Sequence, residues 1–181
     1  MTGSIPSELG NIGSKLEYIY LGGCQLTGAI PESLYTGLTG LTDFYLNSNK
    51  LTGGISKSVS NFKKLTNLAL DHNKLTGMIP STVGNLKKLG YFDVSTNKLS
   101  GPIPASLGNC KSLYHLTVND NMLSGHIPQS LADLTNYIYV DFSNNKLVGQ
   151  IPQGPGFVNQ TASAFSGNKG LCGHPLPACK S

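Results

Sequence analysis

The chain has 181 residues, of which 39% are hydrophobic, 12% charged and 8% aromatic, and its 13 Lys, 9 acidic residues and lack of Arg give a net charge of +4. This length fits one domain, and no apolar run reaches the ~18 residues that a membrane-spanning helix needs. The mild, scattered positive charge disfavours a nucleic-acid-binding protein.

Six strings of the form Leu-Thr-Gly-x-Ile-Pro, some with a Ser or Val replacement, recur along the chain. They begin at residues 26, 51, 75, 99, 123 and 147, so the period is 24 or 25 residues. Self-similarity at a fixed period of this size is typical of a solenoid in which each repeat forms one turn. We therefore expect a chain of stacked turns.

Each string follows a segment of the form Leu-x-x-Leu-x-Leu-x-x-Asn. Its alternating apolar residues predict a short strand with one buried face, and stacked strands build a parallel β-sheet. The variable third, fifth, seventh and eighth positions cannot point inward, so we expect them to form an exposed concave face. The predicted core positions are Leu16, Ile19, Leu21, Leu41, Phe44, Leu46, Leu65, Leu68, Leu70, Leu89, Phe92, Val94, Leu113, Leu116, Val118, Tyr137, Val140 and Phe142.

Five of the six repeats place Asn at the bend after the strand, and the remaining repeat has Cys24 there. An Asn amide can pair with main-chain groups of the neighbouring turn, so we expect an inward ladder formed by Asn49, Asn73, Asn97, Asn121 and Asn145. Segments such as PSELGN, PSTVGN and PASLGN begin after Pro and end in Gly-Asn. They predict short helical or 3₁₀ segments on the convex side.

The combined pattern resembles the plant-specific leucine-rich repeat, in which Gly-x-Ile-Pro is the subclass signature. The resemblance implies an α/β repeat fold: a right-handed solenoid with a parallel concave β-sheet and short 3₁₀ or helical convex segments. We expect residues 1–152 to form one partial and six full repeats, and residues 153–181 to form a C-terminal cap. Because the chain opens within a repeat and lacks the paired-cysteine N-terminal cap of plant extracellular members, we expect a segment of a larger protein in preference to a naturally uncapped chain. The alternative is an N-terminal face that pairs with another copy of the chain.

The period stops after Pro152, and Phe157, Phe165 and Leu171 are available to cover the last turn. The run F-x-G-N-x-G-L-C-G-x-P-L, from Phe165 to Leu176, resembles the C-terminal cap of plant receptor-like proteins.

That resemblance implies a disulfide between Cys172 and Cys179. Cys24 and Cys110 lie about three and a half repeats apart, on the order of 17 Å by strand spacing, which is too far for a bridge. We expect both to be free, buried thiols. Asn159 begins the one Asn-x-Ser/Thr acceptor sequence for glycosylation in the chain.

Charge and aromatic residues are segregated on the predicted surface. Five of the nine acids and five of the eight Tyr occupy variable strand positions, whereas the Lys residues follow the Asn bends or lie on the convex side. Tyr provides a rigid apolar body with a polar tip, and acids between such anchors select a basic or hydroxyl-rich partner. We expect Tyr18, Tyr20 and Tyr45 to form an aromatic end, and Asp71, Asp93, Asp120 and Asp141 to form an acidic stripe. The complete predicted partner-binding surface is Tyr18, Tyr20, Asp43, Tyr45, Asp71, His72, Tyr91, Asp93, His115, Asp120, Tyr139 and Asp141.

The resemblance implies a non-enzymatic recognition module, namely the ectodomain, or a fragment of it, of a plant receptor-like kinase or receptor-like protein in signalling or defence. Its partner would be a protein or peptide ligand, a co-receptor or a pathogen wall-degrading enzyme. The location would be the apoplast or the cell surface, although residues 1–6 lack the features of a secretory signal. Receptors that hold a ligand carboxylate with an Arg-x-Arg pair are a poor match, because the chain has no Arg. We expect no catalytic residues, cofactor or metal, because no matched nucleophile or converging ligand set is present.

Two other functions fit the same repeat class. A secreted inhibitor of a fungal polygalacturonase would use the acidic face against a basic enzyme, and its inhibition would weaken as salt rises. An ice-binding protein would need a flat, regular ladder such as Thr27, Thr52, Thr76, Ser100 and Ser124, which Val148 and the flanking Lys residues interrupt.

Overall fold

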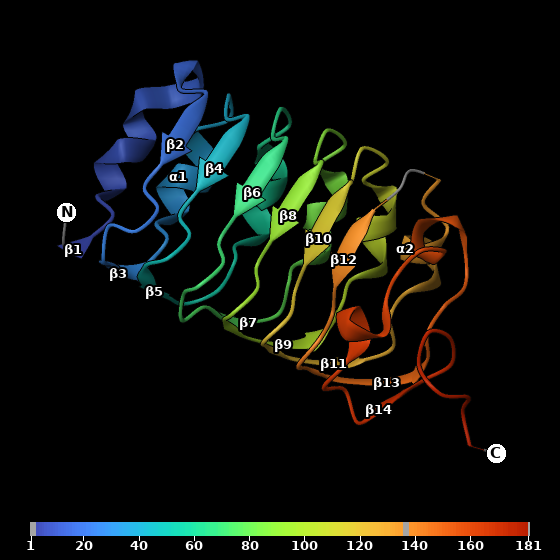
Figure 1. Cartoon of the computed structure of the whole chain (residues 1–181). Coiled ribbons are helices and arrows are strands. Elements are labelled where there is room, and N and C mark those ends of the chain that lie inside the picture. The colour runs from blue at the N-terminus through green and yellow to red at the C-terminus, as the bar shows by residue number, and fades with distance from the viewer. Residues whose placement is uncertain (1–2, 136–137, 181) are drawn as a thin grey trace.

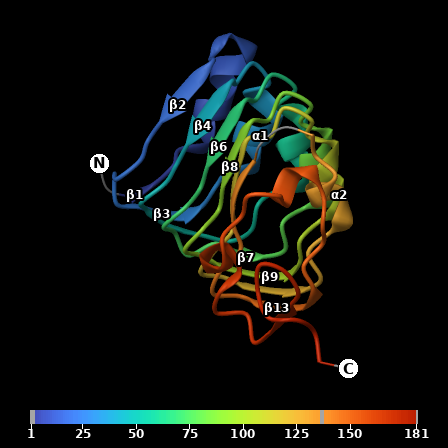
Figure 2. The same cartoon turned by 45° about the vertical axis from the view of Figure 1, so that its right-hand side comes forward.

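The computed structural model describes residues 3–135 and 138–180 and forms a curved solenoid of stacked turns (Figure 1). Each full turn has three walls: a strand of the concave sheet, a strand of a second sheet and a short helix on the convex side. Figure 2 shows the concave strands and the helices on opposite sides of the interior, with the second sheet closing the turn below them. The sequence predicted this solenoid architecture correctly.

The concave sheet has six parallel strands in chain order. Equivalent positions of successive repeats pair directly, so that Tyr18 lies beside Asp43 and His115 lies beside Tyr139. The variable side chains of each repeat therefore form straight rows across the sheet. The strands are β2 (Tyr18–Tyr20), β4 (Asp43–Tyr45), β6 (Asn67–Ala69), β8 (Tyr91–Asp93), β10 (His115–Thr117) and β12 (Tyr139–Asp141).

The Leu-Thr-Gly-x-Ile-Pro strings supply most of a second wall of β-structure, which the sequence analysis did not predict. This wall consists of a three-stranded and a five-stranded parallel sheet, which together are called the second sheet below. The Gly that follows Leu-Thr, Leu-Ser or Leu-Val in each string has a left-handed backbone, with φ of 78° at Gly77 and 77° at Gly101. A Cβ at Gly77 would meet nothing within 4 Å, so the backbone dihedral, and not lack of space, selects Gly there. The three-stranded sheet consists of β1 (Gly3–Ser4), β3 (Leu26–Ala29) and β5 (Lys50–Thr52). The five-stranded sheet consists of β7 (Thr76–Gly77), β9 (Lys98–Pro102), β11 (Met122–Gly125), β13 (Lys146–Gln150) and β14 (Gly170–Cys172).

The convex segments begin directly after an extended Pro or Ser, as the sequence predicted for the Pro-initiated ones. They pack so closely that a Cβ on Gly84 would collide with the carbonyl oxygen of Ser106, and the Ser106 hydroxyl donates to the Ser81 carbonyl at 2.6 Å. None of the helices in the described part of the chain is long and apolar enough to cross a membrane. The segments are η1 (Ser7–Lys15), α1 (Glu32–Gly37), η2 (Lys57–Asn61), η3 (Ser81–Asn85), η4 (Ala105–Asn109) and α2 (Gln129–Ala132).

One continuous hydrophobic core runs through the turns and contains most of the predicted positions. Leu16 and Leu21 are exceptions because they are only partly buried: β2 is the edge strand of the concave sheet, so no turn covers them from outside. The predicted core residue Tyr137 and the repeat position at Met1 lie outside the described residues.

The segment after Pro152 covers the last turn through η5 (Pro155–Phe157), η6 (Ala162–Phe165) and β14. The rings of Phe157 and Phe165 each lie 5.8 Å from the ring of Phe142, and all three are buried. These apolar contacts close the C-terminal end of the core, as the sequence predicted.

The structure confirms the predicted pairing of the cysteines and corrects the predicted burial of one of them. Cys172 and Cys179 form a disulfide, with a sulfur–sulfur distance of 2.01 Å. Cys24 and Cys110 are free thiols, and Cys110 is buried. Cys24 is only partly buried, because it lies in the first described concave turn, at the edge of the sheet.

Candidate functional site

The Asn ladder fixes the bends that border the concave face. In Asn97, Oδ1 accepts from the Leu75 amide at 2.9 Å, and Nδ2 donates to the carbonyls of Leu70 at 3.0 Å and Val94 at 3.1 Å. The same pattern recurs at Asn49, Asn73, Asn121 and Asn145. Each turn is thereby tied to its neighbour by a side chain as well as by the sheet.

A further rung, Asn168 in the cap, was missed by the sequence analysis. Its Oδ1 accepts from the Leu147 amide at 3.0 Å and its Nδ2 donates to the Phe142 carbonyl at 3.0 Å. The signal was present, because Asn168 follows Phe165 in the same spacing as the ladder Asn follows the last apolar residue of a strand. The cap therefore continues the ladder beyond the regular repeats.

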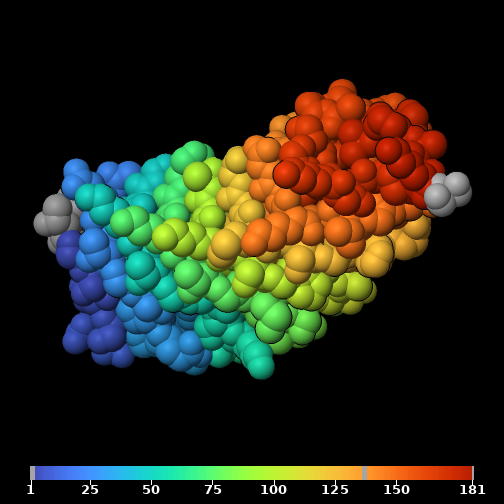
Figure 3. All heavy atoms as spheres, turned by 90° about the horizontal axis from the view of Figure 1, so that it is seen from below, coloured from blue at the N-terminus to red at the C-terminus, as the bar shows by residue number. Residues whose placement is uncertain are grey.

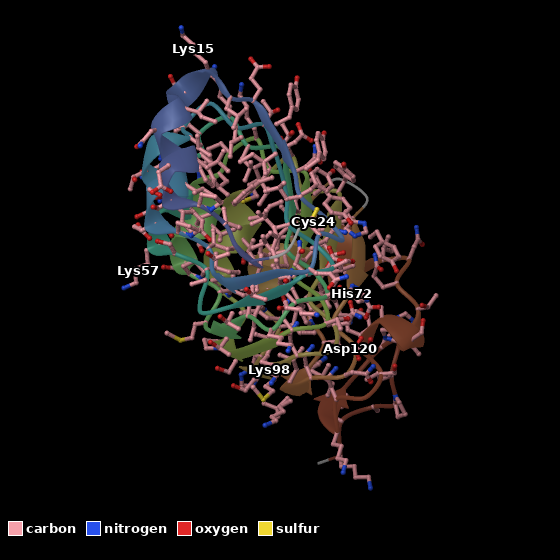
Figure 4. All side chains as sticks on the ribbon, turned by 90° about the vertical axis from the view of Figure 1, so that its left-hand side faces the viewer. Lys15, Cys24, Lys57, His72, Lys98 and Asp120 are labelled. Carbon is pink, nitrogen blue, oxygen red and sulfur yellow. A yellow bond between two sulfur atoms is a disulfide. The ribbon has the colours of Figure 1, made fainter. Side chains whose placement is uncertain are left out.

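The residue before each ladder Asn adopts a left-handed backbone, with φ between 51° and 55° at Ser48, His72, Thr96, Asp120 and Asn144. This sharp corner separates the concave sheet from the second sheet. In Figure 4, which views the N-terminal end of the solenoid, His72 and Asp120 lie at this corner, Lys98 lies on the second-sheet wall and Lys57 lies on the convex wall. The corner thus keeps the Lys side chains that follow it off the concave face.

The predicted aromatic end is one part of a longer aromatic row. Tyr20 lies 5.0 Å from Tyr45 between ring centroids, and Tyr45 lies 6.5 Å from Tyr91. The row continues through His115, which stacks on Tyr91 at 4.2 Å and on Tyr139 at 5.0 Å. Its complete membership is Tyr18, Tyr20, Tyr45, Tyr91, His115 and Tyr139.

Some variable positions are buried, which corrects the expectation that all of them are exposed. Ala69, Ser95, Thr117 and Ser143 are each less than 9% exposed. They carry small side chains between larger neighbours. Ala69 sits between the strands that carry Tyr45 and Tyr91, and its small size lets these rings approach each other across it.

The acidic residues are held by hydrogen bonds but do not form one stripe. Asp93 and Asp141 share one row of the sheet, with Thr117 between them, whereas Asp71 and Asp120 occupy later positions of their repeats. Asp93 accepts from the Ser95 amide at 2.9 Å, and Tyr91 donates to it at 3.3 Å.

The remaining acids are fixed in a similar way. Asp120 accepts from the side chains of Asn119 at 2.7 Å and Asn144 at 2.8 Å. Asp71 pairs with His72 at 2.9 Å, and Asp43 accepts from the Asn67 side chain at 2.7 Å. All twelve predicted binding residues are at least partly exposed on this face. The five Asp residues among them form an acidic patch around the aromatic row.

Burial favours the neutral forms of two rings at the centre of the aromatic row, Tyr91 and His115. Burial, reinforced by Asp93, raises the pKa of Tyr91 far above its ordinary value of 10.0. Burial also lowers the pKa of His115 below 6.5, although the nearby Asp93 opposes that shift. At neutral pH the face therefore presents uncharged rings beside carboxylates.

Tyr114 belongs to this surface and was missed by the sequence analysis. Its ring is 53% exposed and occupies the space that a Cβ of Gly90 would need, and its hydroxyl lies 3.5 Å from Oδ1 of Asn67. Sequence spacing places Tyr114 outside the variable set, and only the contact with Gly90 in the preceding turn brings it to the edge of the concave face.

A small hollow lies where the aromatic row meets the cap. It has a volume of about 180 Å³ and is lined by Tyr139 and Asp141 from β12 and by Asn159, Gln160 and Ser163, among others, from the cap. Asn159, the predicted glycosylation acceptor, is exposed at this hollow.

Comparison with known proteins identifies the repeat. A family model described as leucine rich repeat matches residues 14–75 and 63–123. No curated protein matches the chain.

Solved structures give close matches. The plant peptide hormone receptor RGFR1 in complex with RGF2 is 41% identical, with a TM-score of 0.80 over 83% of this chain and 24% of that chain. The ectodomain of the membrane receptor kinase GASSHO1/SCHENGEN3 from Arabidopsis thaliana, in complex with CASPARIAN STRIP INTEGRITY FACTOR 2, is 30% identical, with a TM-score of 0.77 over 99% and 24%. A plant ice-binding protein is 26% identical, with a TM-score of 0.60 over 100% and 73%.

The chain spans about a quarter of the length of the two receptor ectodomains. The family model covers more than half of the chain, and the parallel sheets, 3₁₀ segments and Asn ladder are the parts of that repeat. The protein therefore belongs to the leucine-rich-repeat family and is similar to the ectodomains of plant receptor kinases.

Proposed function

We propose that this chain is a non-enzymatic recognition module of a plant receptor-like kinase or receptor-like protein, and that it binds an extended peptide or protein segment along the aromatic row. The observation that carries this proposal is the unbroken row of rings from Tyr18 to Tyr139, flanked by carboxylates. The structures of the two receptors named above are complexes with partners, which supports a recognition role.

The geometry supports a ligand with apolar or aromatic side chains and at least one basic group. Because most of these rings stack on one another, they present mainly their edges and hydroxyl groups to a ligand, which pack against apolar side chains and form hydrogen bonds. The carboxylates of Asp71, Asp93 and Asp141 supply the opposite charge. Because the ladder and the hydrogen bonds already hold these groups, little ordering free energy is spent on binding.

We place the module outside the cell, in the apoplast or at the cell surface. The Cys172–Cys179 disulfide supports an oxidising compartment. We propose that Asn159 carries a glycan there, that residues 1–152 are the repeat domain, and that residues 153–181 are its cap. A signalling or defence role, with a co-receptor or a pathogen wall-degrading enzyme as partner, remains part of this proposal.

The two rival functions have distinct tests. A polygalacturonase inhibitor would reduce enzyme turnover, and raising the salt concentration would weaken that inhibition because the contact is ionic. An ice-binding protein would halt ice growth through the hydroxyl positions of the second sheet, and Thr52→Val together with Thr76→Val would change that activity while leaving concave-face binding intact.

A concave-face variant tests the leading proposal. We choose Tyr45→Ala with Asp93→Asn, because Asn keeps the oxygen that accepts from the Ser95 amide, whereas Ala would leave that buried amide without its partner. The matched control carries Lys63→Ala with Lys88→Ala on the convex side, where both side chains are exposed.

Peptides selected from a displayed library on the wild-type protein should lose affinity for the concave variant by about tenfold or more, as expected for truncating an aromatic anchor. They should keep their affinity for the control, and the melting temperatures of all three proteins should agree closely. Equal affinity for the wild-type protein and the concave variant would place the binding surface elsewhere.

A further inference from the structure

The outward face of the second sheet carries a regular arrangement of Lys and hydroxyl side chains. Four turns of this sheet carry an exposed Lys at or just before the start of the strand. In three of them the residue two positions later, on the same face, is Thr or Ser: Lys50 with Thr52, Lys74 with Thr76, and Lys98 with Ser100. The fourth, Lys146, is followed by Val148. Figure 3 views the molecule from below, where successive turns cross this face as bands from the N-terminal end to the cap.

The strands of this sheet are staggered, unlike those of the concave sheet. Lys98 pairs with Thr76 of the preceding turn, and not with Lys74. Lys50 likewise pairs with Thr27, and Lys146 pairs with Ser124. A two-residue stagger therefore brings each Lys beside a hydroxyl of the turn before it.

Lys74 follows the same register. Its amide donates to the Leu51 carbonyl at 2.8 Å, and the Thr76 amide donates to the Gly53 carbonyl at 2.8 Å, which sets Lys74 beside Thr52. With strands about 4.8 Å apart and a stagger of two residues, the Cα atoms of Lys50, Lys74 and Lys98 are about 8 Å apart from turn to turn, with a hydroxyl residue between them. The next turn carries Met122 at the Lys position, so Lys146 lies two turns beyond Lys98. We name this arrangement, Lys50, Lys74, Lys98 and Lys146 with Thr27, Thr52, Thr76 and Ser124, the Lys–hydroxyl array.

Among the described residues, no acidic side chain forms an ion pair within 4.0 Å with a Lys of the array. The ion pair that the described residues do form joins His72, at the left-handed corner, to Asp71 on the concave side of it. An uncompensated row of like charges on a rigid sheet raises the local concentration of a polyanion.

We propose that the Lys–hydroxyl array binds an extended, carboxylate-bearing polysaccharide, a polyuronate, with carboxylates on the Lys ammonium groups and sugar hydroxyls on Thr and Ser. A Lys ammonium offers three donors to a carboxylate, and a Thr hydroxyl both donates to and accepts from a sugar hydroxyl. Each array pair thus matches a sugar unit that carries both groups. This assignment rests on the extracellular location given under the proposed function.

Two other polyanions match the array less well. Single-stranded nucleic acid is bound through base stacking on aromatic rings and through Arg, and the outward positions of the described second-sheet strands carry no Tyr, Phe or Trp. Anionic phospholipid lies mainly in the cytoplasmic leaflet, which an extracellular module does not contact. Binding of a polyuronate requires neither aromatic rings nor contact with the cytoplasmic leaflet.

Substitution of the array tests the proposal against polygalacturonate as the probe. The array variant carries Lys50→Gln, Lys74→Gln and Lys98→Gln. The control carries Lys63→Gln, Lys64→Gln and Lys88→Gln on the convex side, and so has the same net charge as the array variant.

We expect wild-type protein and control to bind polygalacturonate at about 0.1 M salt, where charges beyond about 10 Å are screened, and the array variant to bind at least about tenfold more weakly. Thr27→Val with Thr52→Val and Thr76→Val should weaken binding without any change in charge. Circular dichroism melting checks that each variant is folded.

Three results would overturn the proposal: no binding by the wild-type protein, an equal loss in array variant and control, or tighter binding to single-stranded DNA or to phosphatidylserine vesicles than to polygalacturonate. The Tyr45→Ala, Asp93→Asn variant should bind polygalacturonate as the wild-type protein does. The peptide-affinity measurements therefore test the peptide-recognition proposal, and the polygalacturonate measurements test this one separately.

Discussion

Removal of one rung of the Asn ladder should destabilise the whole solenoid by a predictable amount. Asn97→Ala leaves the Leu75 amide without its acceptor, because Oδ1 of Asn97 is the partner of that amide. The carbonyls of Leu70 and Val94 are affected less, since each also accepts from the next rung of the ladder, Asn73 or Asn121.

An unsatisfied interior amide costs about 1–3 kcal/mol, and the lost bonds to shared carbonyls add about 1 kcal/mol. We therefore expect Asn97→Ala to lower the free energy of unfolding by about 2–4 kcal/mol. For a chain of this length that corresponds to a melting temperature lower by roughly 4–16 °C.

Urea unfolding followed by circular dichroism measures this change. The matched control is Asn109→Ala, which makes the same chemical change at an exposed convex position and should shift the free energy by less than about 0.5 kcal/mol. An equal shift for the two variants, or a shift at residue 97 within experimental error, would refute the reasoning that the ladder satisfies the bends.

Three further predictions concern backbone, thiols and protonation. Thr96 is β-branched and has a left-handed backbone, with φ of 51°, a conformation that Asn adopts more readily. Thr96→Asn should therefore raise the free energy of unfolding by about 1 kcal/mol, and a decrease would contradict the inference that the Thr96 backbone is strained. Burial raises the pKa of Cys110 to about 11, so iodoacetamide at pH 8 should alkylate Cys24 and spare Cys110 until urea unfolds the chain, as mass spectrometry of the peptides would establish. Because burial holds the pKa of His115 below its unfolded value of 6.5, the unfolded state binds more protons as pH falls through that value, so stability should decrease from about pH 7 to about pH 5. The decrease should be smaller for His115→Phe, and an identical slope in the two proteins would contradict the assignment.

The sequence predicts most of the fold because each repeat has the same residue types at the same structural positions. The Leu positions specify the buried face of each strand, the ladder Asn specifies the bend, and Pro specifies the start of most convex segments. The second sheet escaped prediction because Leu-Thr-Gly-x-Ile-Pro is too short for a two-residue periodicity to stand out. This sheet is defined by pairing between neighbouring turns, as between Lys98 and Thr76, and the sequence of a single repeat does not reveal such pairing.

The site is only partly predictable for a similar reason. Variable positions identify which residues face outward, and all twelve predicted binding residues do. Spacing alone does not say which rings touch: the row passes from Tyr45 to Tyr91 because Ala69 is small, and Tyr114 joins the face because Gly90 leaves room for it. Both features depend on contacts between turns.

Site-specific photo-crosslinking tests the central claim most directly. A photoreactive phenylalanine derivative would replace Tyr91 in the middle of the aromatic row, and in separate proteins Lys88 on the convex side or Lys98 on the second sheet. With a library-selected peptide bound, the account predicts a covalent adduct at position 91 and none at 88 or 98. Adducts at 88 or 98, with none at 91, would contradict the assignment of the concave face as the recognition surface.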